Sequence, residues 1–212
     1  MKMKKKTSFI IKNKTNLAGV LLFIAGIIIF MGIITAESYY PLDDPYTTRE
    51  NEISDLGATK PPNSIIRQPS ATIFNITMIL TGIIILCATF LLQLESQNLL
   101  LTVPLGVLGI GVLGVGIFPG NITPWHSIFA FIIFTAGGIG AILSYRFTRF
   151  PINLVFLVLG VIALFFLFFN ELFIPYIGKG GTERFVAYPI MFWMIGLGSY
   201  LTKSTFKKKQ TP

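Results

Sequence analysis

Residues 17–36 read LAGVLLFIAGIIIFMGIITA, a run of 20 residues without a charged side chain. A helix that crosses the roughly 30 Å hydrocarbon layer of a membrane needs about 20 mainly apolar residues. Five further stretches fit this template without overlap, namely 70–94, 99–118, 126–145, 151–174 and 184–202. The sequence therefore predicts an all-α fold, an integral membrane bundle of six transmembrane helices over residues 17–202.

The overall composition is also typical of a membrane protein. Of the 212 residues, 53% are hydrophobic and only 12% are charged, and the mean hydropathy is +0.73. This amount of apolar surface exceeds what one soluble core would bury. Because the six stretches occupy most of the chain, we expect no separate soluble domain.

The formal net charge of +8 arises mainly at the two ends, in a basic N-terminal segment (1–16) and a basic tail (203–212). In the six-helix topology, twelve Lys and Arg residues fall on the side of the termini and five on the opposite side. Cytoplasmic loops carry the excess of positive charge. We therefore expect a multi-pass protein of the cell membrane with both termini in the cytoplasm. The basic runs adjoin apolar helices, which favours membrane lipids as partners and no nucleic acid.

The chain contains one cysteine, Cys87, and one histidine, His126. Neither an intramolecular disulfide nor a metal site built from several Cys or His residues can form from this set. We expect no metal and no cofactor. The first apolar stretch ends in Thr35-Ala36-Glu37 without a small-x-small cleavage pattern, so it is interpreted as a retained signal anchor.

The connections between the predicted helices are unequal in length, and the outer loop 37–69 is the longest. Long loops in compact proteins are usually functional or disordered. This loop mixes aromatic and apolar residues such as Tyr40, Tyr46 and Leu56 with acidic ones. A freely mobile linker would carry fewer large apolar groups. The pattern favours an ordered cap that lies on the bundle.

Polar side chains gather at the outer ends of the predicted helices. Thr123 and Pro124 suit the N-cap and the first position of a helix, which puts His126 in the first turn. The positive end of the helix dipole favours a neutral imidazole that can accept a proton. Glu171 lies about one turn inside the predicted helix 151–174, where an unpaired acid is costly and is therefore a functional candidate. Asn75 is a weaker candidate, because one amide can simply link two helices.

The last outer loop is rich in glycine and carries Lys179, Glu183 and Arg184 directly before the final apolar stretch. Backbone amides, a helix N-terminus and basic side chains together suit an anionic headgroup or a phosphate. The alternative is a flexible turn with an interfacial pair between Glu183 and Arg184.

Two hypotheses connect these elements. In the first, Asp55 and His126 act as acid and base on a lipid whose phosphate is held by Arg184, and Ser54 is a further ligand-binding candidate. A triad of Ser54, Asp55 and His126 is a special case of this hypothesis. In the second, Asp55 caps backbone amides and pairs with Arg184, forming a polar clasp that fixes the long loop. Physical grounds alone favour the clasp.

Three motifs resemble elements of a known family: Ile53-Ser54-Asp55-Leu56-Gly57, Phe118-Pro119-Gly120 ahead of His126, and Gly181-Thr182-Glu183-Arg184 leading to Tyr188-Pro189. With the six-helix pattern, they make almost the whole chain similar to the prokaryotic membrane proteins catalogued as domain of unknown function 998. The first motif also resembles a short element of the damage-regulated autophagy modulator family. Neither resemblance implies an established reaction. The first implies that the outer-face elements belong to one fold.

The leading functional hypothesis is a polar site at the extracytoplasmic face for a lipid or a lipid-linked anionic headgroup. Its candidate catalytic residues are Asp55 and His126, and its candidate ligand-binding residues are Ser54, Asn75, Glu171, Lys179, Glu183 and Arg184. A non-catalytic sensor or scaffold would use the same pocket, so whether the protein is an enzyme stays open. A small transporter is the third alternative, although the predicted helix centres offer almost no charged residues to line a route.

Overall fold

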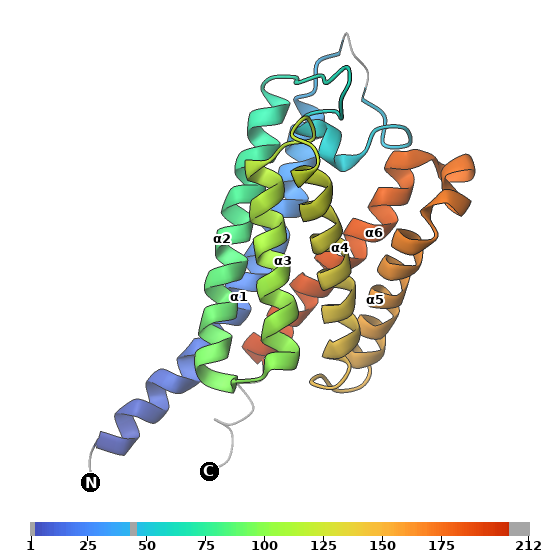
Figure 1. Ribbon diagram of the computed structural model, residues 1–212. Helices are drawn as coiled ribbons and strands as arrows, with labels where there is room; N and C mark the ends of the chain where they lie inside the picture. Colours follow the sequence, from blue (N-terminus) through green and yellow to red (C-terminus); the bar gives the residue numbers. More distant parts are fainter. Residues whose placement is uncertain (1–2, 43–45, 204–212) are drawn as a thin grey trace.

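The computed structural model describes residues 3–42 and 46–203. Its described part contains six α-helices, one short 3-10 helix and no strand, which confirms the all-α prediction (Figure 1). The elements in chain order are α1 (Met3–Ser38), η1 (Ile53–Leu56), α2 (Ser70–Ser96), α3 (Leu99–Ile117), α4 (Trp125–Ser144), α5 (Ile152–Phe168) and α6 (Asn170–Lys203). Residues 1–2 of the basic N-terminal segment, residues 43–45 of the long loop and residues 204–212 of the basic tail lie outside the described residues.

Five of the described helices contain segments that are long and apolar enough to cross a membrane. These segments are Lys14–Ser38, Ser70–Ser96, Leu99–Ile117, Trp125–Ser144 and Asn170–Thr202. The helix α5 is equally apolar but shorter, with 17 residues. At 1.5 Å per residue it is about 25 Å long, close to the lower limit for a spanning helix. The chain is a multi-pass membrane protein.

The helices form a ring in chain order. Each helix packs against the next, α6 closes the ring by packing against α1, and α4 also contacts α6. The described chain begins and ends at the same end of the bundle, and the long loop 39–69 covers the opposite end, which we call the loop end (Figure 1). The loop between α3 and α4 and the turn between α5 and α6 also lie at the loop end. All the polar candidates of the sequence therefore belong to elements that meet there.

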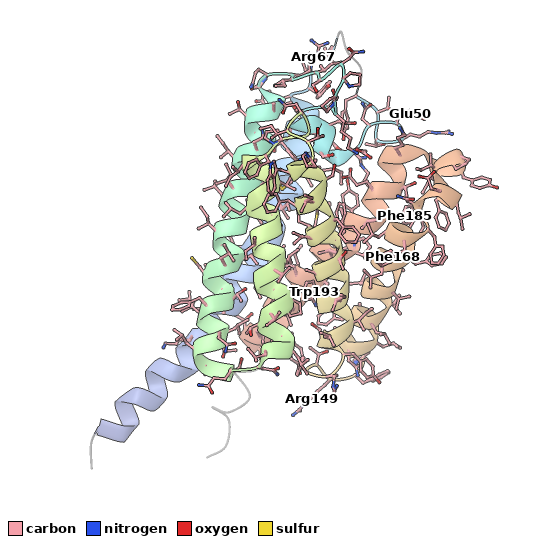
Figure 2. The ribbon with its side chains drawn as sticks, in the orientation of Figure 1. Glu50, Arg67, Arg149, Phe168, Phe185 and Trp193 are labelled. Carbon is pink, nitrogen blue, oxygen red and sulfur yellow. The ribbon has the colours of Figure 1, made fainter. Side chains whose placement is uncertain are left out.

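The interior of the bundle is apolar, and so is its outside. Trp193 is fully buried, and its indole N–H donates a hydrogen bond of 2.9 Å to Ser144 Oγ on α4. Large apolar side chains such as Phe90 and Phe168 are more than half exposed, and Phe168 is labelled in Figure 2. Exposure of this apolar surface to water would be strongly unfavourable, whereas lipid tails solvate it. Because the helices are apolar both on their buried side and on their outward side, hydropathy locates them well in the sequence.

The boundary between α5 and α6 differs from the prediction. The predicted helices 151–174 and 184–202 correspond to Ile152–Phe168 and Asn170–Lys203, so residues expected in an outer loop are helical. Phe169 leaves the helical conformation with φ −116° and ψ 26°. Apolar residues continue past this turn as Leu172, Phe173 and Ile174. Because both sides of the turn are apolar, hydropathy gives no sign of where the chain reverses.

Candidate functional site

The long loop is fixed to α6 by Arg184, which is 8% exposed. One terminal nitrogen, Nη2, donates to Glu37 Oε1 at 2.6 Å and to the Tyr46 hydroxyl at 2.7 Å. The other, Nη1, donates to three carbonyl oxygens at 3.0 Å each, those of Thr48, Asn51 and Gly180. The planar guanidinium carries several donors in a fixed arrangement, which suits this convergence of acceptors. We call Arg184 and these acceptors the arginine clasp.

Tyr46 extends the arginine clasp into the loop, because its hydroxyl donates to the Glu52 carbonyl oxygen at 3.0 Å. Burial raises the pKa of Tyr46 above its usual value, and the nearby Arg184 opposes this rise without cancelling it. The phenol therefore stays protonated at neutral pH and keeps its donor for Glu52.

A break in α6 lets the loop backbone approach the helix. Gly178 has φ 76° and ψ 170°, a conformation that side chains with a Cβ rarely adopt. The amides of Gly180 and Gly181 then donate to the Arg49 carbonyl oxygen at 2.9 and 3.2 Å. A Cβ atom on Gly180 would lie 2.0 Å from the Asn51 carbonyl oxygen. Glycine is required here because the two backbones touch.

The short helix η1 is held by two carboxylates. Asp55 Oδ2 accepts a hydrogen bond of 2.9 Å from the Glu52 amide, and a Glu183 carboxylate oxygen on α6 accepts one from the Ile53 amide. Burial raises the pKa of Asp55, and the hydrogen bond from Glu52 only partly offsets this rise. Asp55 thus caps a backbone amide, as the clasp hypothesis expects. Arg184, however, pairs with Glu37 instead of Asp55.

A pocket of about 370 Å³ lies at the loop end beside η1, between α4, α5 and α6. Its polar wall contains loop residues and residues near the beginnings of α4 and α6: Glu52, Ser54, Lys60, His126, Ser127, Asn170, Glu171, Lys179, Thr182 and Glu183. Its apolar wall contains Ala130, Phe131, Phe134, Phe166, Leu167, Ile174 and Val186. We call this space the amphipathic pocket. Phe131 is 53% exposed and Ser127 is also exposed, so this side of α4 borders the outside of the bundle.

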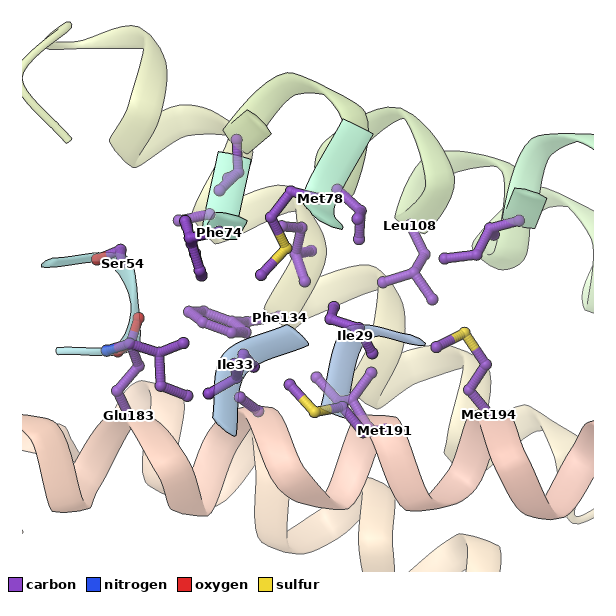
Figure 3. Close-up of a pocket in the computed structure, with 18 of the residues that line it drawn as sticks. Ile29, Ile33, Ser54, Phe74, Met78, Leu108, Phe134, Glu183, Met191 and Met194 are labelled. Atoms are coloured by element: carbon purple, nitrogen blue, oxygen red, sulfur yellow. The ribbon is translucent and has the colours of Figure 1, made fainter. Parts of the chain in front are cut away.

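A narrower cavity of about 60 Å³ runs inside the bundle and is almost entirely apolar (Figure 3). Figure 3 shows Ser54 and Glu183 near one end and Met194 near the other. The cavity shares five lining residues with the amphipathic pocket: Ser54, His126, Ala130, Phe134 and Glu183. These five residues form the junction between the two spaces.

His126 is the most deeply buried of the polar residues at this junction, with 1% exposure. Its Nδ1 lies 2.8 Å from the Phe118 carbonyl oxygen, which can only accept a hydrogen bond. Nδ1 therefore carries a proton. In a neutral imidazole the other nitrogen, Nε2, is then an acceptor. The first-turn position expected from the sequence is the position that the structure shows.

Lys60 is the basic residue that the long loop contributes to the pocket. Its Nζ lies 2.5 Å from Glu52 Oε2, and the two side chains form an ion pair. Burial acts to lower the pKa of Lys60, but Glu52, Glu183 and Asp55 outweigh it and raise the pKa above its usual value. Lys60 therefore remains a cation at neutral pH.

The structure brings some of the predicted site residues together and separates others. Ser54, His126, Glu171, Lys179 and Glu183 line the amphipathic pocket. Asp55, Asn75 and Arg184 do not line it. In the part of the chain that the structure describes, no hydrogen bond joins Asp55 to His126, and Asp55 is engaged at Glu52.

Arg184 and Asn75, which also do not line the amphipathic pocket, make contacts elsewhere at the loop end. Arg184 is committed to the arginine clasp, with five acceptors around its terminal nitrogens. Asn75 lies against Gly57, where an added Cβ would be 2.6 Å from Asn75 Oδ1. Among the described atoms this oxygen has no hydrogen-bond partner.

Sequence reasoning missed the pocket residues Glu52 and Lys60 and the aromatic wall of Phe131 and Phe166. Glu52 lies three residues before Asp55, a spacing typical of a reciprocal cap. This spacing was the one sequence signal that could have pointed to Glu52. Within the described ranges, no group of three or more His, Cys, Asp and Glu residues could hold a metal ion.

Comparison with known proteins gives one family. The model of the family described as "Protein of unknown function (DUF998)" matches residues 17–200, which include all six helices in whole or in large part. No curated protein and no solved structure matches the chain.

Proposed function

We propose that this chain, which belongs to the DUF998 family of proteins of unknown function, binds one lipid or lipid-linked molecule in the amphipathic pocket. The observation that carries the proposal is the division of this single pocket into a polar wall and an apolar wall. Binding sites for small molecules are concave and mostly apolar, with a few polar groups that fix orientation. A molecule with a headgroup and a hydrocarbon chain matches both walls at once.

The position of the pocket supports an orientation for such a ligand. The polar wall is at the loop end, and the apolar residues Ala130, Phe131 and Phe134 of α4 and Val186 of α6 lie further along these helices than the polar lining residues of the same helices. The headgroup would thus lie under the long loop and the chain would extend toward the hydrocarbon layer. The exposed side chains of Ser127 and Phe131 mark a side through which a lipid could enter from the membrane.

We further propose that the loop end is extracytoplasmic and that the protein lies in the cell membrane with cytoplasmic termini. The support is the excess of Lys and Arg on the side of the termini. Reporter domains fused after residue 212 test this orientation. A reporter that is active only in the cytoplasm is expected to work there, and one that is active only outside is expected to fail. The reverse result would contradict the orientation.

A catalytic role is a second candidate, and His126 is the observation that favours it. Its protonated Nδ1 leaves Nε2 as an acceptor at the junction of the two spaces, beside the hydroxyl-bearing Ser54. A neutral imidazole in such a position can act as a general base. Lipid analysis of a deletion strain and a His126→Ala strain tests this role. A shared change in the lipid profile supports catalysis, whereas unchanged profiles in both support a sensor or scaffold.

Transport has less support. The space beyond the junction is about 60 Å³ in volume and apolar, so it offers a polar solute neither room nor hydrogen bonds.

Filling the pocket tests lipid binding directly. Ala130 lines both spaces, so Ala130→Trp would place an indole ring at their junction. Ile128 is on the same helix and is 44% exposed, which makes Ile128→Trp a matched control. Native mass spectrometry of the purified proteins is expected to detect retained lipid on the wild type and the control, with at least about tenfold less on Ala130→Trp.

A second variant keeps the test informative if Ala130→Trp does not fold. Ser127 is exposed at the edge of the pocket, so Ser127→Trp obstructs entry without crowding the junction. Equal lipid retention by all four proteins would contradict the proposed function.

A further inference from the structure

The carboxylate of Glu183 has an unusual position for an acid in a membrane protein. It belongs to the spanning segment Asn170–Thr202 and lines both the amphipathic pocket and the narrow cavity. Its described hydrogen bond comes from the Ile53 amide and occupies one oxygen. A carboxylate can accept about four hydrogen bonds. Most of the accepting capacity of Glu183 therefore has no partner among the described hydrogen bonds.

The cations near Glu183 are engaged elsewhere or lie further out. The neighbouring Arg184 pairs with Glu37 at 2.6 Å, and Lys60 pairs with Glu52 at 2.5 Å. Lys179 lines the same pocket, but its side chain is exposed. Among the ion pairs of the described residues, none includes Glu183. Charges inside membrane segments are normally paired or reached by a partner from a cavity.

The other polar groups at the junction are also acceptors or can act as acceptors. His126 presents Nε2 as an acceptor, and Ser54 contributes a hydroxyl that both donates and accepts. When Glu183 is ionised, the deep end of the pocket combines one negative charge with several acceptors. This set favours a ligand group that is positively charged and carries several N–H donors. The lysines, in contrast, come from the loop and from the exposed first turns of α6.

We propose that the amphipathic pocket recognises a lipid headgroup with a protonated primary amine and a phosphate, of the phosphoethanolamine class. The ammonium group binds at Glu183, His126 and Ser54, and the phosphate lies toward Lys60 and Lys179. This inference rests on the proposed function and gives its ligand a chemical class. It also revises the sequence hypothesis in which Arg184 holds the phosphate, because the phosphate now lies toward Lys60 and Lys179.

A primary amine fits better than a quaternary one for a physical reason. An ammonium group has three N–H donors for the acceptors at the junction. A trimethylated ammonium has none, so Ile53 would remain the only described donor to Glu183. Charge-assisted hydrogen bonds are roughly twice as strong as neutral ones, and their loss leaves the half-buried carboxylate poorly solvated.

The test compares three lipids with identical acyl chains and different headgroups: phosphoethanolamine, phosphocholine and phosphoglycerol. Their affinities for the full-length wild type in detergent are measured by native mass spectrometry titration. We expect the phosphoethanolamine lipid to bind at least about tenfold more tightly than the other two. Equal affinities, or a preference for the phosphoglycerol lipid, would overturn the inference.

A variant assigns the preference to Glu183. Glu183→Gln keeps a carbonyl oxygen for the Ile53 amide and removes the charge, so we expect the preference to fall to about twofold or less. Glu50→Gln is the control, because Glu50 forms an exposed pair with Arg49 at 3.1 Å. A preference that persists in Glu183→Gln would also overturn the inference. The wild-type comparison needs no variant and remains decisive if Glu183→Gln does not fold.

The two proposals fail in different ways. If the three lipids bind equally and Ala130→Trp abolishes binding of all three, the pocket binds lipid but does not recognise the amine. If Ala130→Trp changes no affinity, the proposed function itself is refuted.

Discussion

Replacing Arg184 with methionine is expected to destabilise the protein by about 3–5 kcal/mol, the usual cost of removing one partner from a buried ion pair. The side chains of Arg184 and Glu37 are only 9% and 21% exposed, and their atoms lie 2.6 Å apart. Methionine keeps an unbranched apolar chain in the same space but leaves the carboxylate without its cation. Three backbone carbonyls and the Tyr46 hydroxyl lose their donor as well.

The matched control is Arg49→Gln. Arg49 also pairs with a glutamate of the long loop, Glu50, at 3.1 Å, but these side chains are 64% and 67% exposed. Exposed pairs contribute about 0–1 kcal/mol, because water screens the charges and the side chains lose entropy when they pair. The two substitutions therefore differ in the burial of the ion pair and in the number of acceptors that lose a donor.

Thermal unfolding of the purified proteins in detergent, followed by tryptophan fluorescence, measures both effects. In chains of this size about 1 kcal/mol shifts Tm by roughly 2–4 °C. We expect Arg184→Met to lower Tm by about 6–20 °C and Arg49→Gln by at most about 4 °C. Equal shifts for the two variants would refute the conclusion that the arginine clasp holds the long loop.

Two further predictions concern the same loop. Gly180→Ala is expected to lower Tm by several degrees, because its Cβ would lie 2.0 Å from the Asn51 carbonyl oxygen, whereas Gly181→Ala meets nothing nearer than 3.3 Å and should change Tm little. An unchanged Tm in Gly180→Ala would show that the backbones are not in contact. Because burial raises the pKa of Asp55 in the folded state, the contribution of Asp55 to stability falls as pH rises from its unfolded pKa of about 4 through its folded pKa. Asp55→Asn keeps an acceptor for the Glu52 amide, so we expect a flatter dependence of Tm on pH above about 4, and an unaltered dependence would contradict this role.

Much of the fold could be predicted because lipid imposes simple requirements. Each spanning helix needs a long apolar run, and the chain contains little else. The turn at Phe169 escaped prediction since apolar residues continue on both sides of it. The early start of α1 escaped as well, because its first turns carry lysines outside the apolar template.

The candidate site was predicted only in outline. Ser54, His126 and Glu183 could be predicted as candidates because polar residues near the ends of apolar helices are few. Which side each one faces is a question of packing. Glu183 and Arg184 are adjacent, so they point in directions about 100° apart on the helix, and sequence alone does not tell which faces the pocket.

The partners of Arg184 were beyond sequence reasoning for a related reason. Thr48 and Asn51 are 136 and 133 residues away along the chain, and both offer backbone carbonyls that carry no sequence signature. The aromatic wall of Phe131 and Phe166 was hidden too, because an apolar residue facing a pocket has the same sequence signal as one facing lipid.

The most direct test of lipid binding is a cryo-electron microscopy map of the protein in nanodiscs made with lipids of its own membrane. We predict elongated density in the amphipathic pocket, with its polar end beside Glu183 and its chain along Phe131 and Phe166. A map in which water or protein side chains alone fill this pocket would contradict the account.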